Sequence, residues 1–203
     1  FAITVSDGHD GTDSVTVAVT INAVNDVPSF TVGANQTVAE DCGVQSVPSW
    51  IAAKSAGPDN ENLQTLSYHL SVTSQTVTDG LSLFAVDPAV SPEGTLTYTP
   101  ADNANGTATI SIKVQDTGGG DTDTSAEQSF TIAVTALNDK PVITGSAAAE
   151  TPEDTPYVYA FRLADVEDGP DHLTIEYETN NTALLEKSSM TLGGSGADRT
   201  LTV

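Results

Sequence analysis

Apolar and polar residues alternate along several stretches of this chain. The two longest, residues 14–24 (SVTVAVTINAV) and 129–137 (SFTIAVTAL), place an apolar residue at almost every second position against Ser, Thr and Asn. A period of two is typical of a β-strand with one buried face. Shorter runs of the same kind occupy residues 2–5, 30–32, 66–72, 81–86, 95–98, 109–114 and 173–177.

Gly, Pro, Asn and Asp separate these runs, and no window sustains a helical period for more than about two turns. A density of about seven strands in roughly 110 residues is that of an antiparallel β-sandwich. The pattern therefore predicts an all-β chain, with Trp50 as an anchor of the core.

A short motif, Asn-Asp-x-Pro, occurs twice, each time just after one of the two long runs. Asn25 and Asn138 are 113 positions apart (138 − 25 = 113), and Glu40 and Glu153 share this spacing (153 − 40 = 113). Two unrelated strings with one spacing indicate an internal repeat about the size of a small domain.

The repeat divides the chain into three parts. Residues 1–27 match the C-terminal hairpin of a preceding repeat plus its linker, residues 28–138 form a complete repeat, and residues 139–203 match the N-terminal part of a following one. In the first strand of the hairpin, the spacing between equivalent residues is shorter than 113: Asp7 and Asp116 are 109 positions apart (116 − 7 = 109). We therefore expect a segment of a longer array.

Acidic residues dominate the charge of the chain. With 28 Asp and Glu against 6 Lys and Arg, the net charge is −22. Nucleic acid is therefore not an expected partner, since phosphate binding needs a basic surface. The acids gather in short turns, where two charges about 5 Å apart repel by about 3 kcal/mol at an effective dielectric constant of about 20. A divalent cation is the simplest neutralising partner.

Catalytic chemistry has little support in the sequence. The three histidines, His9, His69 and His172, lack the spacing of a zinc site. Paired carboxylates remain as an alternative, but their placement in repeated turns argues against an active site. We therefore expect no enzyme. The single cysteine, Cys42, excludes an intrachain disulfide; we expect it to be partly buried, with intermolecular pairing as the alternative.

The motifs together resemble the bacterial cadherin-like repeats of very large surface proteins, and more distantly cadherin domains with their interdomain linkers. The resemblance covers nearly the whole chain and rests on several motifs in the right order. They are Asp7-Gly8, Asn25-Asp26 with Pro28, the run TYTPADNANGT at residues 97–107, and Glu153-Asp154-Thr155. It implies tandem Greek-key β-sandwich repeats of the cadherin or immunoglobulin type.

The same resemblance implies calcium at the junctions between repeats, held by six to eight oxygens. At the junction after the complete repeat, here called the second junction, the implied ligands are Glu40, Asp102 or Asn103, Asn138, Asp139, Asp165, and Glu167 or Asp168. At the junction before it, the first junction, they are Asn25, Asp26, Asp116, and Asp59 or Glu61. Asp7, in the turn DGHDGTD, is either a further calcium ligand or part of a hairpin turn.

One departure from cadherins concerns the residue before each Asn-Asp pair. True cadherins carry an additional acid there, whereas this chain has Val24 and Leu137. The resemblance then implies fewer ions per junction than in cadherins, and leaves binding at the first junction open.

The function implied is mechanical: a calcium-binding, adhesive or structural repeat region of a secreted or cell-surface protein, whose partners are the neighbouring repeats of its own chain. The alternative is a module that binds surface polysaccharide or another copy of itself. No apolar run is long enough to cross a membrane, so direct insertion is not expected.

Self-association has one specific form here. The parts at residues 1–24 and 139–203 are complementary pieces of one repeat, so that residues 1–24 of one molecule are predicted to pair with residues 139–203 of another. The alternatives are that both ends are frayed, or that both parts belong to a longer ordered chain.

Overall fold

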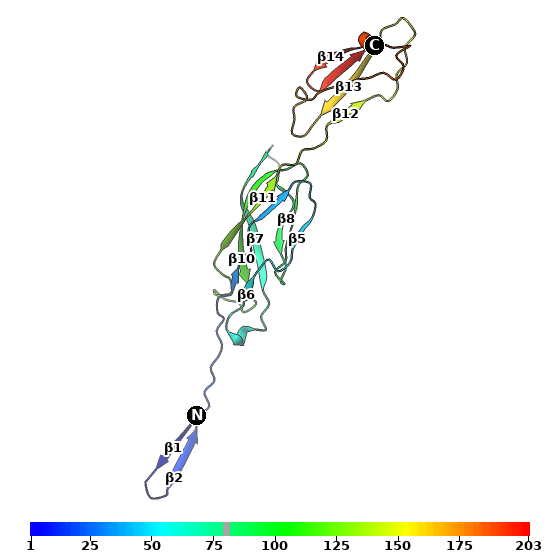
Figure 1. Ribbon diagram of the computed structural model, residues 1–203. Helices are drawn as coiled ribbons and strands as arrows, with labels where there is room; N and C mark the ends of the chain where they lie inside the picture. Colours follow the sequence, from blue (N-terminus) through cyan, green and yellow to red (C-terminus); the bar gives the residue numbers. More distant parts are fainter. Residues whose placement is uncertain (79–81) are drawn as a thin grey trace.

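The computed structural model describes residues 1–78 and 82–203 and is all-β, as predicted (Figure 1). Its elements follow one another as β1 (Ala2–Ser6), β2 (Thr12–Thr16), β3 (Ser29–Thr31), β4 (Gln36–Ala39), β5 (Gln45–Val47), β6 (Ala53–Ser55), the 3-10 helix η1 (Asp59–Glu61), β7 (Ser67–Val77), β8 (Phe84–Val90), β9 (Leu96–Pro100), β10 (Gly106–Gln115), β11 (Gln128–Thr135), β12 (Val142–Gly145), β13 (Val158–Ala164), the 3-10 helix η3 (Lys187–Ser189), β14 (Thr191–Ser195) and β15 (Asp198–Thr202).

Strands β3 to β11 form a β-sandwich. One sheet has the order β4-β11-β10-β7, in which β4 runs parallel to β11 and the other pairs are antiparallel. The facing strands have the order β5-β9-β8, with β3 and β6 paired beside them. The predicted run at residues 81–86 starts at Leu81, which lies outside the described residues, and the described strand β8 starts at Phe84.

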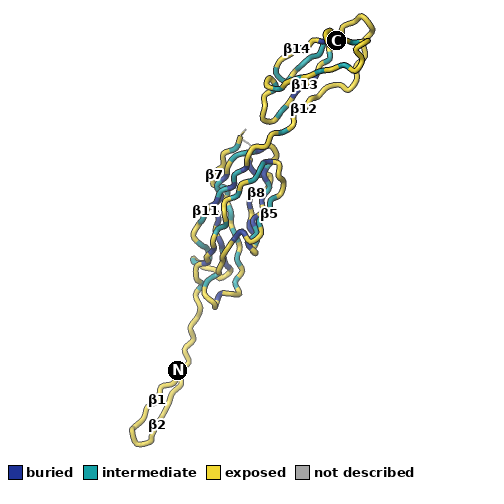
Figure 2. Tube along the Cα trace, viewed as in Figure 1, coloured by how far each residue is buried: buried dark blue, intermediate teal, exposed yellow. Residues whose placement is uncertain are grey.

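The core of the sandwich lies between these sheets (Figure 2). In β10 and β11, the alternating residues Ile110, Ile112 and Ile132 are fully buried, because a period of two turns them all to the same face. Trp50 anchors the core as predicted: its ring lies 4.4 Å from that of Phe130, and its Nε1 donates a hydrogen bond to the carbonyl of Ala34 at 2.9 Å.

The N-terminal hairpin β1-β2 has the same strand register as β10-β11. Ile3 pairs with Val15 in the first hairpin, and Ile112 pairs with Gln128 in the second. These positions are related by the 109- and 113-residue spacings of the sequence repeat (112 − 3 = 109; 128 − 15 = 113). In the complete repeat the apolar face of this hairpin is buried, whereas in β1-β2 it is exposed.

After the complete repeat, four strands form a separate sheet with the order β12-β13-β15-β14. Figure 1 shows the hairpin, the sandwich and this sheet arranged one after another along an elongated molecule. Phe161 and Leu163 of β13 and Met190 before β14 are its buried apolar residues among those described.

Three sequence predictions differ from the structure. Strand β2 ends at Thr16 instead of continuing to residue 24, because its antiparallel partner β1 begins at Ala2, which lies opposite Thr16. Residues 173–177 do not pair with another strand in the described part of the chain, although their exposure alternates as predicted. Cys42 is exposed and not partly buried; it follows the turn at residues 40–41.

Ile132 and Val19 are equivalent positions of the repeat, but only Ile132 is in the core, so we predict that truncating each to Ala changes the free energy of unfolding by different amounts. Ile132→Ala should lower the free energy of unfolding by about 2–5 kcal/mol, because it leaves a cavity in a fully packed site. Val19→Ala, 113 positions earlier and exposed in this chain, should change it by less than about 0.5 kcal/mol. Urea unfolding followed by the fluorescence of Trp50 measures both, and equal costs would contradict this account of the core.

Candidate functional site at the repeat junctions

The acidic side chains that are buried in this protein lie at the two ends of the complete repeat. Among the described residues they are Glu40, Glu61 and Asp116. A buried carboxylate needs hydrogen-bond donors or a cation, because it has lost its water. What surrounds each of these acids therefore shows what the junctions can bind.

At the second junction, Glu40 holds the chain where it leaves the sandwich. Its Oε1 accepts a hydrogen bond from the backbone N–H of Leu137 at 2.7 Å, and the Nδ2 of Asn105 lies 3.5 Å from its Oε2. Glu40 follows β4, which runs parallel to β11, and this parallel pairing brings Glu40 beside the residues that follow β11. A residue early in the repeat is thus positioned beside the linker that ends it.

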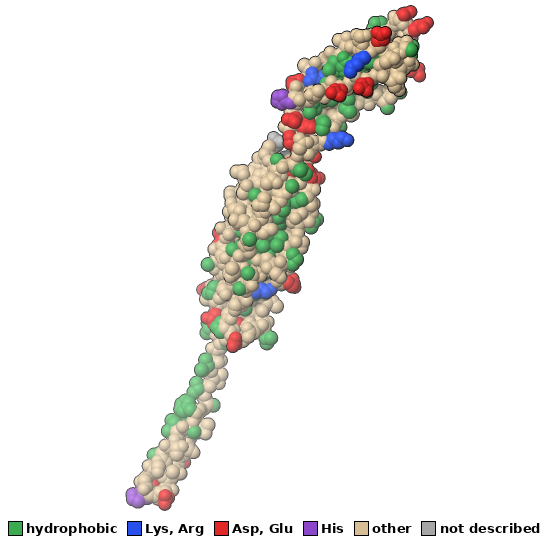
Figure 3. Space-filling view, viewed as in Figure 1, with side chains coloured by type: hydrophobic (Ala, Val, Ile, Leu, Met, Phe, Trp, Pro, Cys, Tyr) green, Lys and Arg blue, Asp and Glu red, His purple; other side chains and the backbone are tan. Residues whose placement is uncertain are grey.

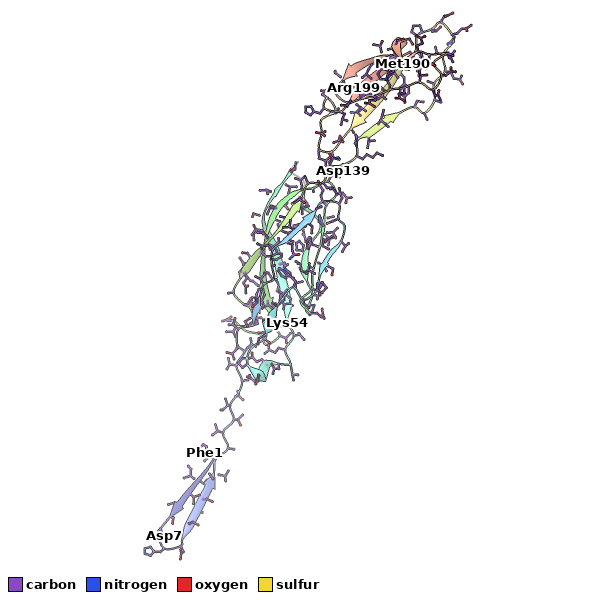
Figure 4. The ribbon with its side chains drawn as sticks, viewed as in Figure 1. Phe1, Asp7, Lys54, Asp139, Met190 and Arg199 are labelled. Carbon is purple, nitrogen blue, oxygen red and sulfur yellow. The ribbon has the colours of Figure 1, made fainter. Side chains whose placement is uncertain are left out.

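Asp139 is the linker residue at the centre of this junction (Figure 4). Its backbone N–H donates to Glu167 Oε2 at 3.0 Å, which ties the linker to the next unit. Its side-chain Oδ2 is buried and has no hydrogen-bond partner among the described residues. Burial raises the pKa of Asp139 above its ordinary value, and the nearby charges of Asp41, Glu167, Glu40 and Asp165 raise it further.

The acids around Asp139 are held by turns. Asp41 has a positive φ of 59°, and its Oδ1 accepts the backbone N–H of Asn103 at 3.0 Å. In the next unit, Asp165 Oδ1 accepts the backbone N–H groups of Glu167 at 3.2 Å and Asp168 at 2.8 Å. Acids of both units and of the linker therefore meet at one place, where Figure 3 also shows acidic side chains.

At the first junction, an amide contacts the buried carboxylate. Asn25 Nδ2 lies 3.3 and 3.4 Å from the two carboxylate oxygens of Asp116, and it also donates to the carbonyl of Thr122 at 3.2 Å. Asn25 Oδ1 accepts a hydrogen bond from Gln64 Nε2 at 2.9 Å. Asp116 further accepts the backbone N–H of Gly118 at 2.9 Å.

Beside this amide, Glu61 holds the backbone of the linker. Its Oε1 accepts the N–H of Asp26 at 3.0 Å, while its Oε2 is buried with no hydrogen-bond partner in the described structure. A side chain at Gly57 would overlap this Oε2, so the loop before η1 needs glycine for the carboxylate to fit. The two junctions thus share a buried carboxylate that accepts a linker N–H, and an unpartnered buried oxygen.

The structure groups only some of the predicted ligands. Glu40, Asp139, Asp165 and Glu167 come together at the second junction, and Asn25, Asp26, Glu61 and Asp116 come together at the first. Asp26 takes part through its backbone N–H, and its side chain is exposed. The side chain of Glu167 is also exposed, as are those of the remaining predicted ligands: Asp102, Asn103, Asn138, Asp168 and Asp59.

Asp7 lies in the turn at the far end of the β1-β2 hairpin from the linker (Figure 4). Its Oδ1 accepts the N–H groups of His9 at 2.8 Å and Gly11 at 3.0 Å. These bonds close the turn, as the hairpin interpretation predicts, and they lower the pKa of Asp7.

Sequence reasoning missed three residues of the junctions. Asp41 follows Glu40 directly, and this pair of adjacent acids was the available signal. Gln64 and Thr122 carry no signal in the sequence, since an isolated amide or hydroxyl in a loop is common. Only the folded chain brings them to Asn25.

In the described residues, no group of three or more His, Cys, Asp or Glu side chains is already arranged to hold a metal ion. The acids at the second junction are near enough to raise the pKa of Asp139, yet they do not form a closed cage. A cation that binds there must therefore draw their oxygens closer together.

Comparison with known proteins finds a family model that matches most of the complete repeat. A family model described as "Bacterial Ig domain" matches residues 25–133, from the Asn of the first junction into β11. Among solved structures, titin domains Z1Z2 in complex with telethonin match 89% of this chain and 83% of theirs, with 14% identity and a TM-score of 0.37. Dpr2 Ig1-Ig2 in complex with DIP-Theta Ig1-Ig3 matches 87% of this chain and 86% of its own, with 11% identity and a TM-score of 0.27. No curated protein matches the chain.

The raised pKa of Asp139 predicts a stabilising substitution. In excess chelator at neutral pH, Asp139→Asn should raise the melting temperature by a few degrees, because it removes a negative charge that folding places beside other carboxylates. An acid with a raised pKa favours folding below its ordinary pKa, and this contribution is lost as the pH rises through the raised value. The advantage of the variant should therefore vanish below about pH 3.9, where the aspartate is also neutral.

Thermal unfolding at several pH values tests this prediction. The matched control is Asp198→Asn, which changes an exposed acid that forms an ion pair with the exposed Arg162 and is not among the acids that raise the pKa of Asp139. The control should not raise the melting temperature. A parent that melts above Asp139→Asn at neutral pH in chelator would contradict the electrostatic account.

Proposed function

The chain belongs to the bacterial Ig domain family, and we propose that it is a calcium-stiffened part of a tandem array in a secreted or cell-surface protein. In this proposal residues 28–138 are the complete repeat, and the junctions are of the cadherin-like type. The observation that carries the proposal is the buried, unpartnered Oδ2 of Asp139, surrounded by carboxylates of two units.

The family supports the coarse part of this role. Bacterial Ig domains are typically non-catalytic structural or adhesive modules, and they usually occur in extracellular or surface proteins. Among the residues that the structure describes, no helix is both long and apolar enough to span a membrane.

Electrostatics supports a cation at the second junction. Asp139 is flanked by the four acids that raise its pKa, and Glu40 is deeply buried among them. Each additional negative charge raises the cost of keeping the others ionised. A bound cation reverses the sign of this interaction, so it converts the repulsion between the two units into attraction.

The donor set fits calcium in kind. Calcium takes six to eight oxygens in a tolerant geometry and accepts carboxylates, carbonyls and water together. Carboxylates would come from Glu40 and Asp41 of the complete repeat, Asp139 of the linker, and Asp165 and Glu167 of the next unit. Because the oxygens must first move together, we expect a dissociation constant of about 10⁻⁴ to 10⁻³ M, as for extracellular modules.

The proposed calcium ligands lie on three parts of the chain: the complete repeat, the linker and the next unit. An ion shared by the repeat, the linker and the next unit removes the freedom of the two units to rotate about the linker. The array would be stiff where external calcium is plentiful and flexible where it is scarce.

Polysaccharide binding, the alternative function, has less support. Sugar rings commonly stack on exposed aromatic side chains, but Trp50, Phe84, Tyr98 and Phe130 of the complete repeat are all buried in the core. Binding between copies, including pairing of residues 1–24 with residues 139–203 of another molecule, stays a prediction.

Calcium titration tests the proposal. The melting temperature should rise with calcium, and at a concentration about 100 times the dissociation constant one ion stabilises the folded chain by about 2.7 kcal/mol. Asp139→Asn should lose most of this gain, although the same variant is the more stable one in chelator. Calorimetry should show weaker calcium binding for this variant.

Two controls sharpen this test. Asp198→Asn should titrate like the parent, and magnesium should stabilise less than calcium, since it demands a regular octahedral site. Identical melting curves of the parent in calcium and in excess chelator would remove the proposal.

A further inference from the structure

The linker residue Asn25 uses its side chain and its carbonyl in hydrogen bonds to the repeat that follows it. The side-chain nitrogen contacts Asp116 and the carbonyl of Thr122, and the side-chain oxygen accepts from Gln64. The hydroxyl of Thr122 donates to the backbone carbonyl of Asn25 at 2.8 Å. The contacts come from two loops, one between η1 and β7 and the other between β10 and β11.

The shape of the site also fits this one side chain. A Cβ at Gly118 would overlap the side-chain amide of Asn25, so glycine leaves the space that the amide fills. The next two anchors follow at once: the N–H of Asp26 is held by the buried Glu61, and Pro28 is fully buried. Three of four consecutive linker residues are thus fixed to the complete repeat.

The chemistry selects asparagine at this place. The site presents an anion, Asp116, together with the amide donor of Gln64 and a backbone carbonyl, so it needs one group that donates and accepts. A carboxylate at residue 25 would repel Asp116. An apolar side chain would remove the acceptor of Gln64 Nε2 and would leave Asp116 with the N–H of Gly118 but without the amide donor.

Residues 18–24, which precede this segment, correspond to residues 131–137 of the complete repeat (18 + 113 = 131; 24 + 113 = 137), so they match the preceding repeat. At the other end, the equivalent residue Asn138 is exposed, and in the described part of the chain its Nδ2 donates to the carbonyl of the adjacent Asp139.

We infer that the base of the complete repeat, formed by Glu61, Gln64, Asp116, Gly118 and Thr122, is a docking site for the segment Asn25-Asp26-Val27-Pro28. Asp116 needs no metal ion in this latch, because the Asn25 amide and the N–H of Gly118 supply its donors. The linker segment therefore moves as part of the repeat that follows it. The inference goes beyond the calcium proposal and does not rest on it.

Hydrogen exchange on the full chain in excess chelator tests the latch. The Asp26 amide should be protected in the parent, since it is bonded to a buried carboxylate. In Asn25→Asp its protection factor should fall at least about tenfold, which corresponds to about 1.4 kcal/mol. The Ile112 amide in β10 serves as the internal control, because its protection falls only if the sandwich itself unfolds.

A second variant leaves Asn25 in place. Gly118→Ala fills the space of the amide, so it should release the linker and lower Asp26 protection to a similar degree. The matched control Asn138→Asp changes the equivalent residue at the other end and should leave Asp26 protection unchanged.

Two results would overturn the inference. One is parent-like protection of Asp26 in both Asn25→Asp and Gly118→Ala. The other is a parent in which the Asp26 amide is unprotected in chelator and becomes protected only when calcium is added. Because melting in calcium is measured separately, failure of the latch and failure of the calcium proposal are distinguishable.

Discussion

A carboxylate that leaves water must find a hydrogen-bond donor or a cation, and this constraint organises both ends of the complete repeat. Each of the three buried acids in the described part of the chain accepts a hydrogen bond from a linker residue. Glu61 and Asp116 hold the chain as it enters the sandwich, and Glu40 holds it as it leaves. The contacts that satisfy these acids therefore also set the direction in which the linkers run, and with it the course of the array.

Different groups surround the linker at the two junctions. At the first junction the Asn25 amide lies against Asp116, while Oε2 of Glu61 is buried with no partner among the described residues. At the second junction Oδ2 of Asp139 is likewise buried without a partner in the described part of the chain, and it has acids on several sides. In the proposed function, calcium would order this acidic side of a junction, whereas hydrogen bonds would hold the linker to the repeat that follows it.

The hydrophobic core of the sandwich is separate from the acidic groups of the junctions. The apolar residues of β10 and β11 pack against the opposite sheet and around Trp50, away from the acids at the two ends. Burial of that surface supplies the stability of the sandwich, so the charge at a junction can change while the repeat stays folded. This separation suits a module whose orientation is regulated and whose fold is constant.

The sequence by itself determined the all-β class, the Trp50 core and the spacing of the repeat, because these depend on local periodicity and on copies of short strings. It also placed Glu40, Asp139, Asp165 and Glu167 at one junction through their resemblance to a known motif. Tertiary structure alone decided the partners of Asn25, since Gln64 and Thr122 lie 39 and 97 positions away in the chain. Alternation specifies which face of a strand is buried, but a neighbouring strand or a hydrogen-bond partner exists only once distant segments have packed together.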